Sequence, residues 1–176
     1  MIASLAGTVL KAGLDSVVLG VGGVGMLVHT TPGTAAAVRV GTPTELATTL
    51  VVREDSLTLY GFATDDEKHV FETIQTVSGV GPRLALAVLA VHSPAAVRVA
   101  LGSGDLAALM KVPGIGKKGA ERLVLELRDK LGALPGSVGE TAPAPADDAL
   151  DKVARRADEG ASVSALLRAA LQELGR

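Results

Sequence analysis

The sequence predicts a multidomain α+β protein in which a β-rich segment comes first, an α-helical segment second, and a linker and a small helical segment last. Three observations lead to this prediction. Short runs rich in β-branched residues fill residues 1–63, apolar residues take a helical spacing over residues 64–132, and Pro, Gly and Ala dominate residues 133–147. We expect residues 148–176 to form the small C-terminal helical domain.

Composition limits what the core and the sites can contain. Apolar residues make up 48% of the chain, but only Tyr60, Phe62 and Phe71 are aromatic, so the core must be mainly aliphatic. The absence of cysteine excludes disulfides, thiolate metal sites and cysteine nucleophiles, and it fits a reducing cytosol. No basic signal-peptide start and no apolar run of about 18 residues occur, so we expect a soluble, cytoplasmic protein without a membrane partner.

Residues 1–63 contain five candidate strands separated by Gly, Pro and Asp. Five strands in a segment of about sixty residues fit an OB-like barrel. In chain order the strands are "IASLAGTVL", "LDSVVLGV", "GMLVHT", "ELATTLVV" and "SLTLYGF". The run "GVGGVG" at residues 20–25 has the glycine spacing of a dinucleotide-binding loop, but strand-like residues follow it where a helix is needed. We therefore interpret it as a turn or a bulge.

Residues 64–132 have the pattern of an all-α domain of five short helices, arranged as two similar pairs. The first three helices begin with a capping box or with a proline in the first turn. These signals are Thr64 with Glu67, Pro82, and Ser93 with Pro94. "GDLAALMKV" predicts the fourth helix, and residues 117–131 predict a longer fifth one.

A glycine turn occurs twice in this segment, as "VSGVG" at residues 77–81 and "VPGIG" at residues 112–116. Glycines permit positive φ and carry no Cβ, so a phosphate can approach the N–H groups of the helix that follows. Cations in the next turn add full charges. The residues predicted to bind DNA phosphates are Gly79, Gly81, Arg83, Gly114, Gly116, Lys117, Lys118 and Arg122.

Two alternatives stand beside this interpretation. The turns could be ordinary helix–helix connections with Gly as the C-cap, although a second copy with cations at the same offset favours phosphate binding. Arg122 could instead pair with Glu126 one helical turn later. The net charge of −2 argues against a nucleic-acid partner, but residues 111–130 hold six cations against three acids. Phosphate contacts of this kind would be independent of base sequence and dependent on salt.

The glycine turns resemble the helix-hairpin-helix motif, and a closer resemblance follows from their order. The OB-like barrel, "VVREDSLTLYGF", "SGVGPRLA", "VPGIGKKGAERLVLEL" and a detached tail together resemble the RuvA family of Holliday junction branch migration proteins. The resemblance covers residues 1–132 almost without a break. It implies a homotetramer that holds a four-way DNA junction open and nearly square, with either one or two tetramers on a junction.

The resemblance also implies partners and a cellular role. It implies recruitment of the hexameric ATPase RuvB for branch migration, and the resolvase RuvC in the same complex, in homologous recombination, DNA repair and the SOS response to DNA damage. The chain itself would be a noncatalytic DNA-binding subunit without a cofactor.

The family's acidic pin corresponds here to Arg53, Glu54 and Asp55. "VVRED" followed by "SLTLY" indicates two strands joined by a tight turn, with the two acids at the tip. Fourfold symmetry would gather about eight carboxylates around one axis, where they would repel phosphates from the crossover. Acids are also common in ordinary solvated turns, and the residues alone favour that simpler explanation. The aromatic-poor barrel suits a scaffold better than a base-stacking groove.

Other signals in the sequence do not support an enzyme or a metal site. Gly116-Lys117-Lys118 lacks the earlier glycine and the Ser or Thr of a Walker A loop. The three histidines show no ligand spacing. Helix-hairpin-helix DNA glycosylases have a similar turn, but a protein of that class would need a catalytic Asp about twenty residues beyond the turn. An accessory module of a nuclease or ligase, the other alternative, would lack the barrel.

The C-terminal tail departs from the family pattern. Two helical patterns, at residues 148–157 and 162–174, follow the flexible linker at residues 133–147, whereas the family implies three helices. Either the domain is shortened or a segment is missing from the chain. The amphipathic end "SALLRAALQEL" either packs on its neighbour or contributes to the RuvB contact that we expect in this tail.

Overall fold

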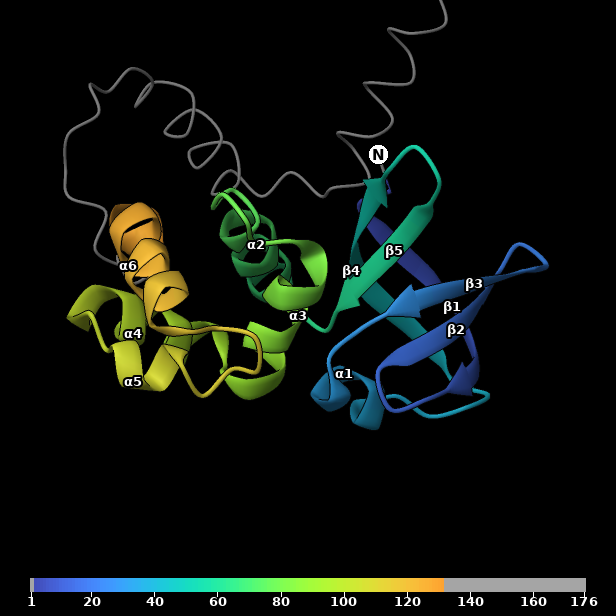
Figure 1. The fold of residues 1–176 in the computed structure, drawn as a ribbon. Coiled ribbons are helices and arrows are strands. Elements are labelled where there is room, and N and C mark those ends of the chain that lie inside the picture. Colours follow the sequence, from blue (N-terminus) through green and yellow to red (C-terminus); the bar gives the residue numbers. More distant parts are fainter. Residues whose placement is uncertain (1, 132–176) are drawn as a thin grey trace, which may run out of the picture. The chain divides into compact units, whose positions relative to one another are not determined.

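A computed structural model describes residues 2–131, which belong to one compact unit (Figure 1). Five strands close into a barrel in the order β1-β2-β3-β5-β4, in which β3 and β5 pair in parallel and the other neighbours are antiparallel. The strands are β1 (Ser4–Ala12), β2 (Ser16–Val21), β3 (Val24–His29), β4 (Pro43–Val52) and β5 (Leu57–Phe62). The predicted five-stranded OB-like barrel is confirmed.

Alternating inward-facing side chains fill the barrel. Val9, Val17, Leu19 and Val28 are fully buried, which is the period-2 pattern of a strand with one face in the core. "GVGGVG" is a tight hairpin turn between β2 and β3, because Gly22 and Gly23 have positive φ and Val21 pairs with Val24.

A short helix between β3 and β4 was not predicted. α1 (Pro32–Ala37) begins after Thr31, whose side chain accepts a hydrogen bond from the Thr34 N–H, and Pro32 occupies its first turn. The sequence analysis assigned no element between the strands "GMLVHT" and "ELATTLVV". Ser93 and Pro94 carry the same signal, so Thr31 and Pro32 could have indicated this helix.

Five helices follow the barrel, as predicted. They are α2 (Asp65–Ile74), α3 (Pro82–Val91), α4 (Pro94–Ser103), α5 (Leu106–Leu109) and α6 (Lys117–Leu131). Thr64 caps α2 by accepting from the Glu67 N–H, while the Glu67 carboxylate accepts from the Ala63 N–H, one residue earlier than in the usual capping box. α5 is a single turn, shorter than "GDLAALMKV" suggested.

The last strand of the barrel and the helices share one hydrophobic cluster, while the barrel interior forms a second one. Phe71 of α2 stacks against Tyr60 and Phe62 of β5, with ring centroids 5.1 and 4.8 Å apart. The same cluster continues through α3 to α6 and ends at Leu131. The helical region is therefore anchored to the last strand of the barrel.

No single helix among residues 2–131 combines the length and the apolar composition needed to cross a membrane; α3 and α4 meet those criteria only as a pair bent by 98°. The predicted linker at residues 133–147 and the predicted helices at residues 148–157 and 162–174 lie outside the described residues.

Candidate nucleic-acid interface

The two glycine turns have the same backbone hydrogen bonds. In the first, the Val80 N–H donates to the Val77 carbonyl at 3.0 Å; in the second, the Ile115 N–H donates to the Val112 carbonyl at 3.1 Å. The next bonds also correspond, from Ala85 to Gly81 and from Ala120 to Gly116. The two segments therefore have the same local structure, in which two helices are joined by a glycine turn.

Only the first glycine of each turn needs to be glycine for its conformation. Gly79 and Gly114 have φ of 83° and 92°, which side chains other than glycine rarely adopt. Gly81 has φ of −90°, and Gly116 also lies outside the positive-φ region. All four glycines permit positive φ, but only the first of each turn adopts it. A Cβ on Gly116 would meet nothing within 4 Å, so what this glycine provides is open space above the helix N-terminus.

The helices that follow these turns begin without a side-chain cap or an acidic first turn. Gly81 is the N-cap of α3 and offers no hydrogen bond, and Gly116 directly precedes α6. By contrast, α2 has Thr64 as its cap and three acids in its first turn. The first N–H groups of α3 and α6 are thus left for an external acceptor, and the helix dipole favours an anion there.

The two turns lie side by side across a small crevice of about 140 Å³. Arg122 of α6 crosses it and donates from Nη1 to the Ser78 carbonyl at 3.1 Å. Within residues 2–131 the only ion pair is between Arg98 and Asp66, so the alternative pairing of Arg122 with Glu126 does not occur. The sequence could not reveal this contact, because 44 positions separate the two residues.

The remaining predicted cations are exposed around these turns. Arg83 lies in the first turn of α3, and Lys117 and Lys118 open α6. None of the three forms an ion pair with a described residue. Their charges are therefore available to an anionic partner in addition to the N–H groups of both helices.

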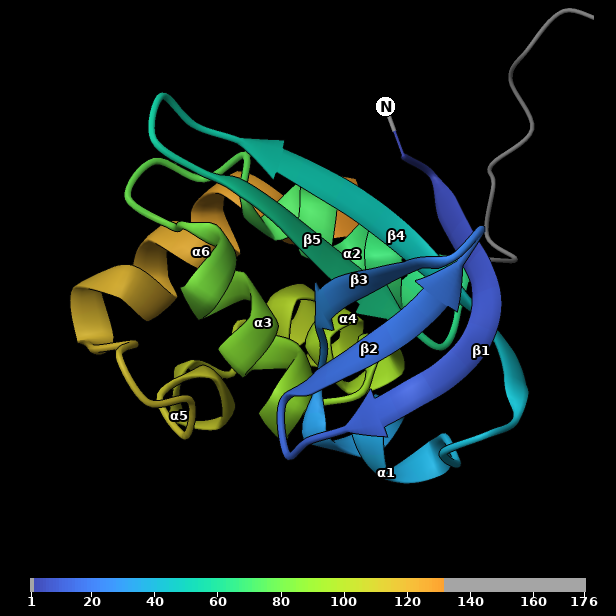
Figure 2. The ribbon, with the colours of Figure 1, turned by 90° about the vertical axis from the view of Figure 1, so that its right-hand side faces the viewer.

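Glu54 and Asp55 lie at the exposed tip of the hairpin that joins β4 to β5. The Arg53 N–H donates to the Ser56 carbonyl at 2.9 Å and closes this turn. Figure 2 shows the turn projecting near the loop that precedes α3. Arg53 reaches toward that loop, since its Nη2 lies 3.9 Å from the point that a Cβ atom would occupy if Gly81 carried one. This contact between the hairpin and the first glycine turn was not predicted.

The described residues contain no group of three or more His, Cys, Asp or Glu side chains arranged to hold a metal ion. His29 packs against Tyr60 with ring centroids 5.9 Å apart, and the Nε2 of His92 lies 3.0 Å from the Ala108 carbonyl oxygen. Both rings thus have structural contacts within the fold.

Comparisons with known proteins agree with this architecture. Residues 1–61 match the family described as RuvA N terminal domain, and residues 71–129 match the SAM-like helix-hairpin-helix tandem. A protein of Salinispora tropica is 54% identical over all of this chain and 99% of its own length. The chain belongs to the RuvA family.

The Salinispora tropica protein and other relatives are named Holliday junction branch migration complex subunit RuvA. Those of Thermobifida fusca and Streptomyces coelicolor are each 51% identical to this chain, which they match over its whole length and over 100% and 99% of their own. The alignment with the Salinispora tropica RuvA spans 198 residues, more than the 176 of this chain, so the relative has residues without a counterpart here. The predicted shortened C-terminal domain concerns residues outside those described.

Proposed function

We propose that this RuvA chain binds four-way DNA junctions as the noncatalytic subunit of a branch migration complex. The observation that carries this proposal is the pair of glycine turns with matching backbone hydrogen bonds, set side by side, each opening an uncapped helix with exposed cations. Two equivalent phosphate sites at a fixed separation can hold one duplex arm by its backbone.

We assign phosphate binding to the residues predicted from the sequence other than Arg122. Backbone N–H groups at Gly79, Gly81, Gly114 and Gly116, together with Arg83, Lys117 and Lys118, would contact phosphates. Arg122 stands apart, because it already donates to the first turn and so holds the two turns together. Contacts of this kind do not read base identity, and binding weakens as salt rises.

The acidic pin, Arg53 with Glu54 and Asp55, would act at the crossover. In a homotetramer about eight of these carboxylates surround the axis, and unit charges about 4 Å apart in water interact by about 1 kcal/mol. Their repulsion of phosphates would keep the four strands apart and the junction nearly square. Either one or two such tetramers would cover the junction.

The motor would be a partner. The sequence has no Walker A loop, so we assign ATP hydrolysis to RuvB, recruited through residues 148–176, with RuvC acting on the same junction. In this proposal residues 1–63 form the barrel with the pin, residues 64–132 form the DNA-binding domain, and residues 133–147 link these two domains to the segment that contacts RuvB. The complex would act in the cytoplasm.

The test is a salt-titrated gel shift that compares a four-way junction with a linear duplex of the same sequences. We expect the wild type to favour the junction by at least about tenfold, equivalent to about 1.4 kcal/mol. The Glu54→Gln/Asp55→Asn double variant should keep its junction affinity but change the junction geometry, measured by energy transfer between dyes on neighbouring arms.

The matched control is Glu45→Gln/Asp65→Asn, which removes two exposed acids elsewhere on the chain. It should leave both affinity and geometry unchanged. Equal affinity of the wild type for junction and duplex would refute the proposed structure selectivity, and an unchanged geometry with the pin variant would refute the role of the pin.

A further inference from the structure

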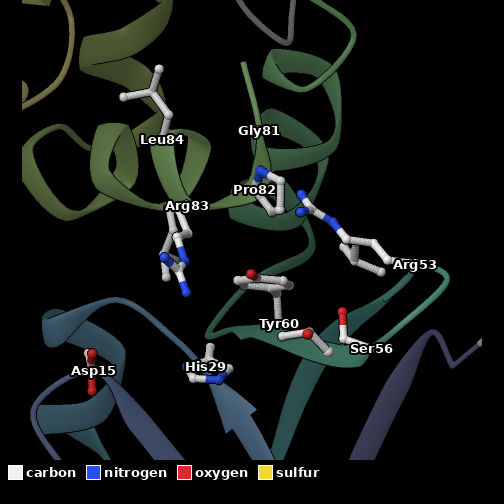
Figure 3. Close-up of a pocket in the computed structure, with 12 residues that line it drawn as sticks. Asp15, His29, Arg53, Ser56, Tyr60, Gly81, Pro82, Arg83 and Leu84 are labelled. Carbon is white, nitrogen blue, oxygen red and sulfur yellow. The ribbon is translucent and has the colours of Figure 1, made fainter. Parts of the chain in front are cut away.

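A cleft of about 810 Å³ separates the barrel from the start of α3 (Figure 3). Its walls come from the hairpin that carries the acidic pin and from the first glycine turn. The polar and charged side chains that line it are Asp15, His29, Arg53, Ser56, Thr58, Tyr60 and Arg83. A cleft of this volume is large enough for a nucleotide-sized group.

Tyr60 lies between the two walls, and its hydroxyl has no partner among the described residues. The residue is only 7% exposed, and its ring is fixed by Phe71 and His29. Figure 3 shows the ring rising from β5 toward Pro82 and Arg83. No buried side-chain polar atom of the described residues lacks a partner, so this hydroxyl is not sealed in the core but opens onto the cleft, where it can donate to an acceptor that enters.

The positive charge around Tyr60 identifies the acceptor as an anion. Arg53 enters from the hairpin, with its Nη2 3.9 Å from the Cβ position of Gly81, and Arg83 enters from the first turn of α3. The uncapped N-terminus of this ten-residue helix adds its dipole. Asp15 is the one acid that lines the cleft, and it pairs with neither arginine. His29 is the remaining titratable group that faces this space besides Tyr60 itself.

We propose that this cleft binds a phosphate group through the Tyr60 hydroxyl, Arg53, Arg83 and the first N–H groups of α3. Phosphate oxygens are strong acceptors, and a guanidinium donates to them in a fixed geometry. The proposed function supplies the source, a phosphodiester of a strand that leaves the crossover between the pin and the first glycine turn. A free phosphate or nucleotide has the same chemistry, and the experiment separates the two sources.

The test uses the full chain with Tyr60→Phe, which removes only the hydroxyl and keeps the stacked ring. Ser103→Ala, which removes a hydroxyl on α4 away from the cleft, is the control. Because the Tyr60 hydroxyl has no partner in the fold, we expect the melting temperature to stay the same. The Kd for the junction should rise about tenfold, and that of the control should not change.

Phosphates near the crossover are then replaced one at a time by neutral methylphosphonates. We expect wild-type binding to weaken at one position on each strand, and the Tyr60→Phe variant to be insensitive at that same position. The same losses for both proteins at every position would overturn the assignment of a DNA phosphate to the cleft, while wild-type preference for the junction would still stand.

Inorganic phosphate and ADP, titrated into the DNA-free protein and followed by NMR, provide the second arm. For a DNA source, we expect shifts at Gly81 and Arg83 only at millimolar ligand. Micromolar affinity that Tyr60→Phe abolishes, without any methylphosphonate effect, would overturn the DNA source in favour of a free anion. Loss of the wild-type junction preference would instead refute the proposed function, which the gel shift measures separately.

Discussion

At the scale of single residues, the ion pair between Asp66 and Arg98 makes the stability of the helical region depend on pH. Arg98 is 6% exposed and donates to both oxygens of Asp66, whose side chain is 47% exposed. The hydrogen bonds from Arg98 lower the pKa of Asp66 below its ordinary value of 3.8. The Asp66 carboxyl therefore binds its proton less tightly in the folded state than in the unfolded state. The free energy of unfolding rises as the pH increases toward the ordinary pKa of 3.8.

We predict that Asp66→Asn lowers the free energy of unfolding by about 1–2 kcal/mol at neutral pH, because it leaves a buried guanidinium without a counter-charge. The loss is smaller than the roughly 3–5 kcal/mol of a fully buried pair, since Asp66 is partly solvated. Urea unfolding measures it. The difference from the wild type should be complete above about pH 3.8 and should shrink as the pH falls further.

The neighbouring residue Asp65 supplies the control for this prediction. Asp65→Asn removes the same charge from the same helical turn but breaks no ion pair, so it should cost no more than about 0.5 kcal/mol. Equal losses of stability for the two variants, or a difference that does not depend on pH, would show that the ion pair between Asp66 and Arg98 does not stabilise the fold.

At the scale of the elements, the first glycine of a turn and the last should respond differently to substitution, as Gly79 of the first turn and Gly116 of the second illustrate. Gly79→Ala places a side chain at φ of 83° and should cost about 1–2 kcal/mol of stability. Gly116→Ala adds a Cβ to open space, so we expect stability within about 0.5 kcal/mol of the wild type but weaker junction binding. The added methyl group would stand between a phosphate and the N–H groups of α6.

Urea unfolding and gel shifts on the same samples check this pair of variants. If Gly116→Ala binds the junction as tightly as the wild type, no phosphate comes close to this helix N-terminus. If it loses stability and affinity together, the glycine serves the fold and the phosphate interpretation of the second turn is wrong.

Local signals predicted the elements, and long-range contacts account for most of what was missed. Thr64, Pro82 and Pro94 marked helix starts correctly because capping depends on neighbours in the sequence. The one missed helix, α1, carried the same signal at Thr31 and Pro32. The contact of Arg122 with Ser78 depends on how α6 packs, which no local pattern specifies.

The same distinction holds for the candidate site. The repeat in the sequence predicted two similar turns, and their hydrogen bonds correspond residue by residue. It did not show that only Gly79 and Gly114 need positive φ, because the spacing of glycines says nothing about which of them is strained. Nor could it show the cleft at Tyr60, whose lining comes from segments far apart in the sequence, from Asp15 to Leu86, that the fold brings together.

At the scale of the whole molecule, the cluster that β5 shares with the helices predicts that the barrel, which has a second cluster inside it, and the helical region unfold together. The families matched in the sequence end at residue 61 and begin again at residue 71, yet one cluster of buried side chains crosses this gap through Tyr60, Phe62 and Phe71. A barrel that unfolded alone would expose the aromatic side of α2. We therefore expect a single cooperative transition for residues 2–131.

Tyr60 is the only tyrosine and the chain has no tryptophan, so the fluorescence comes from this one ring, which contacts Phe71 of α2 and His29 of β3. In a urea titration its midpoint should coincide with the loss of the folded NMR signals of Val9 in the barrel and Leu127 in α6. Phe71→Leu should lower the free energy of unfolding by about 1–2 kcal/mol and move all three urea midpoints down equally, because it loosens packing on both sides of the contact. A variant in which Leu127 unfolds before Val9 would mean that the helices are a separate folding unit, and the pin and the glycine turns could then move independently on DNA.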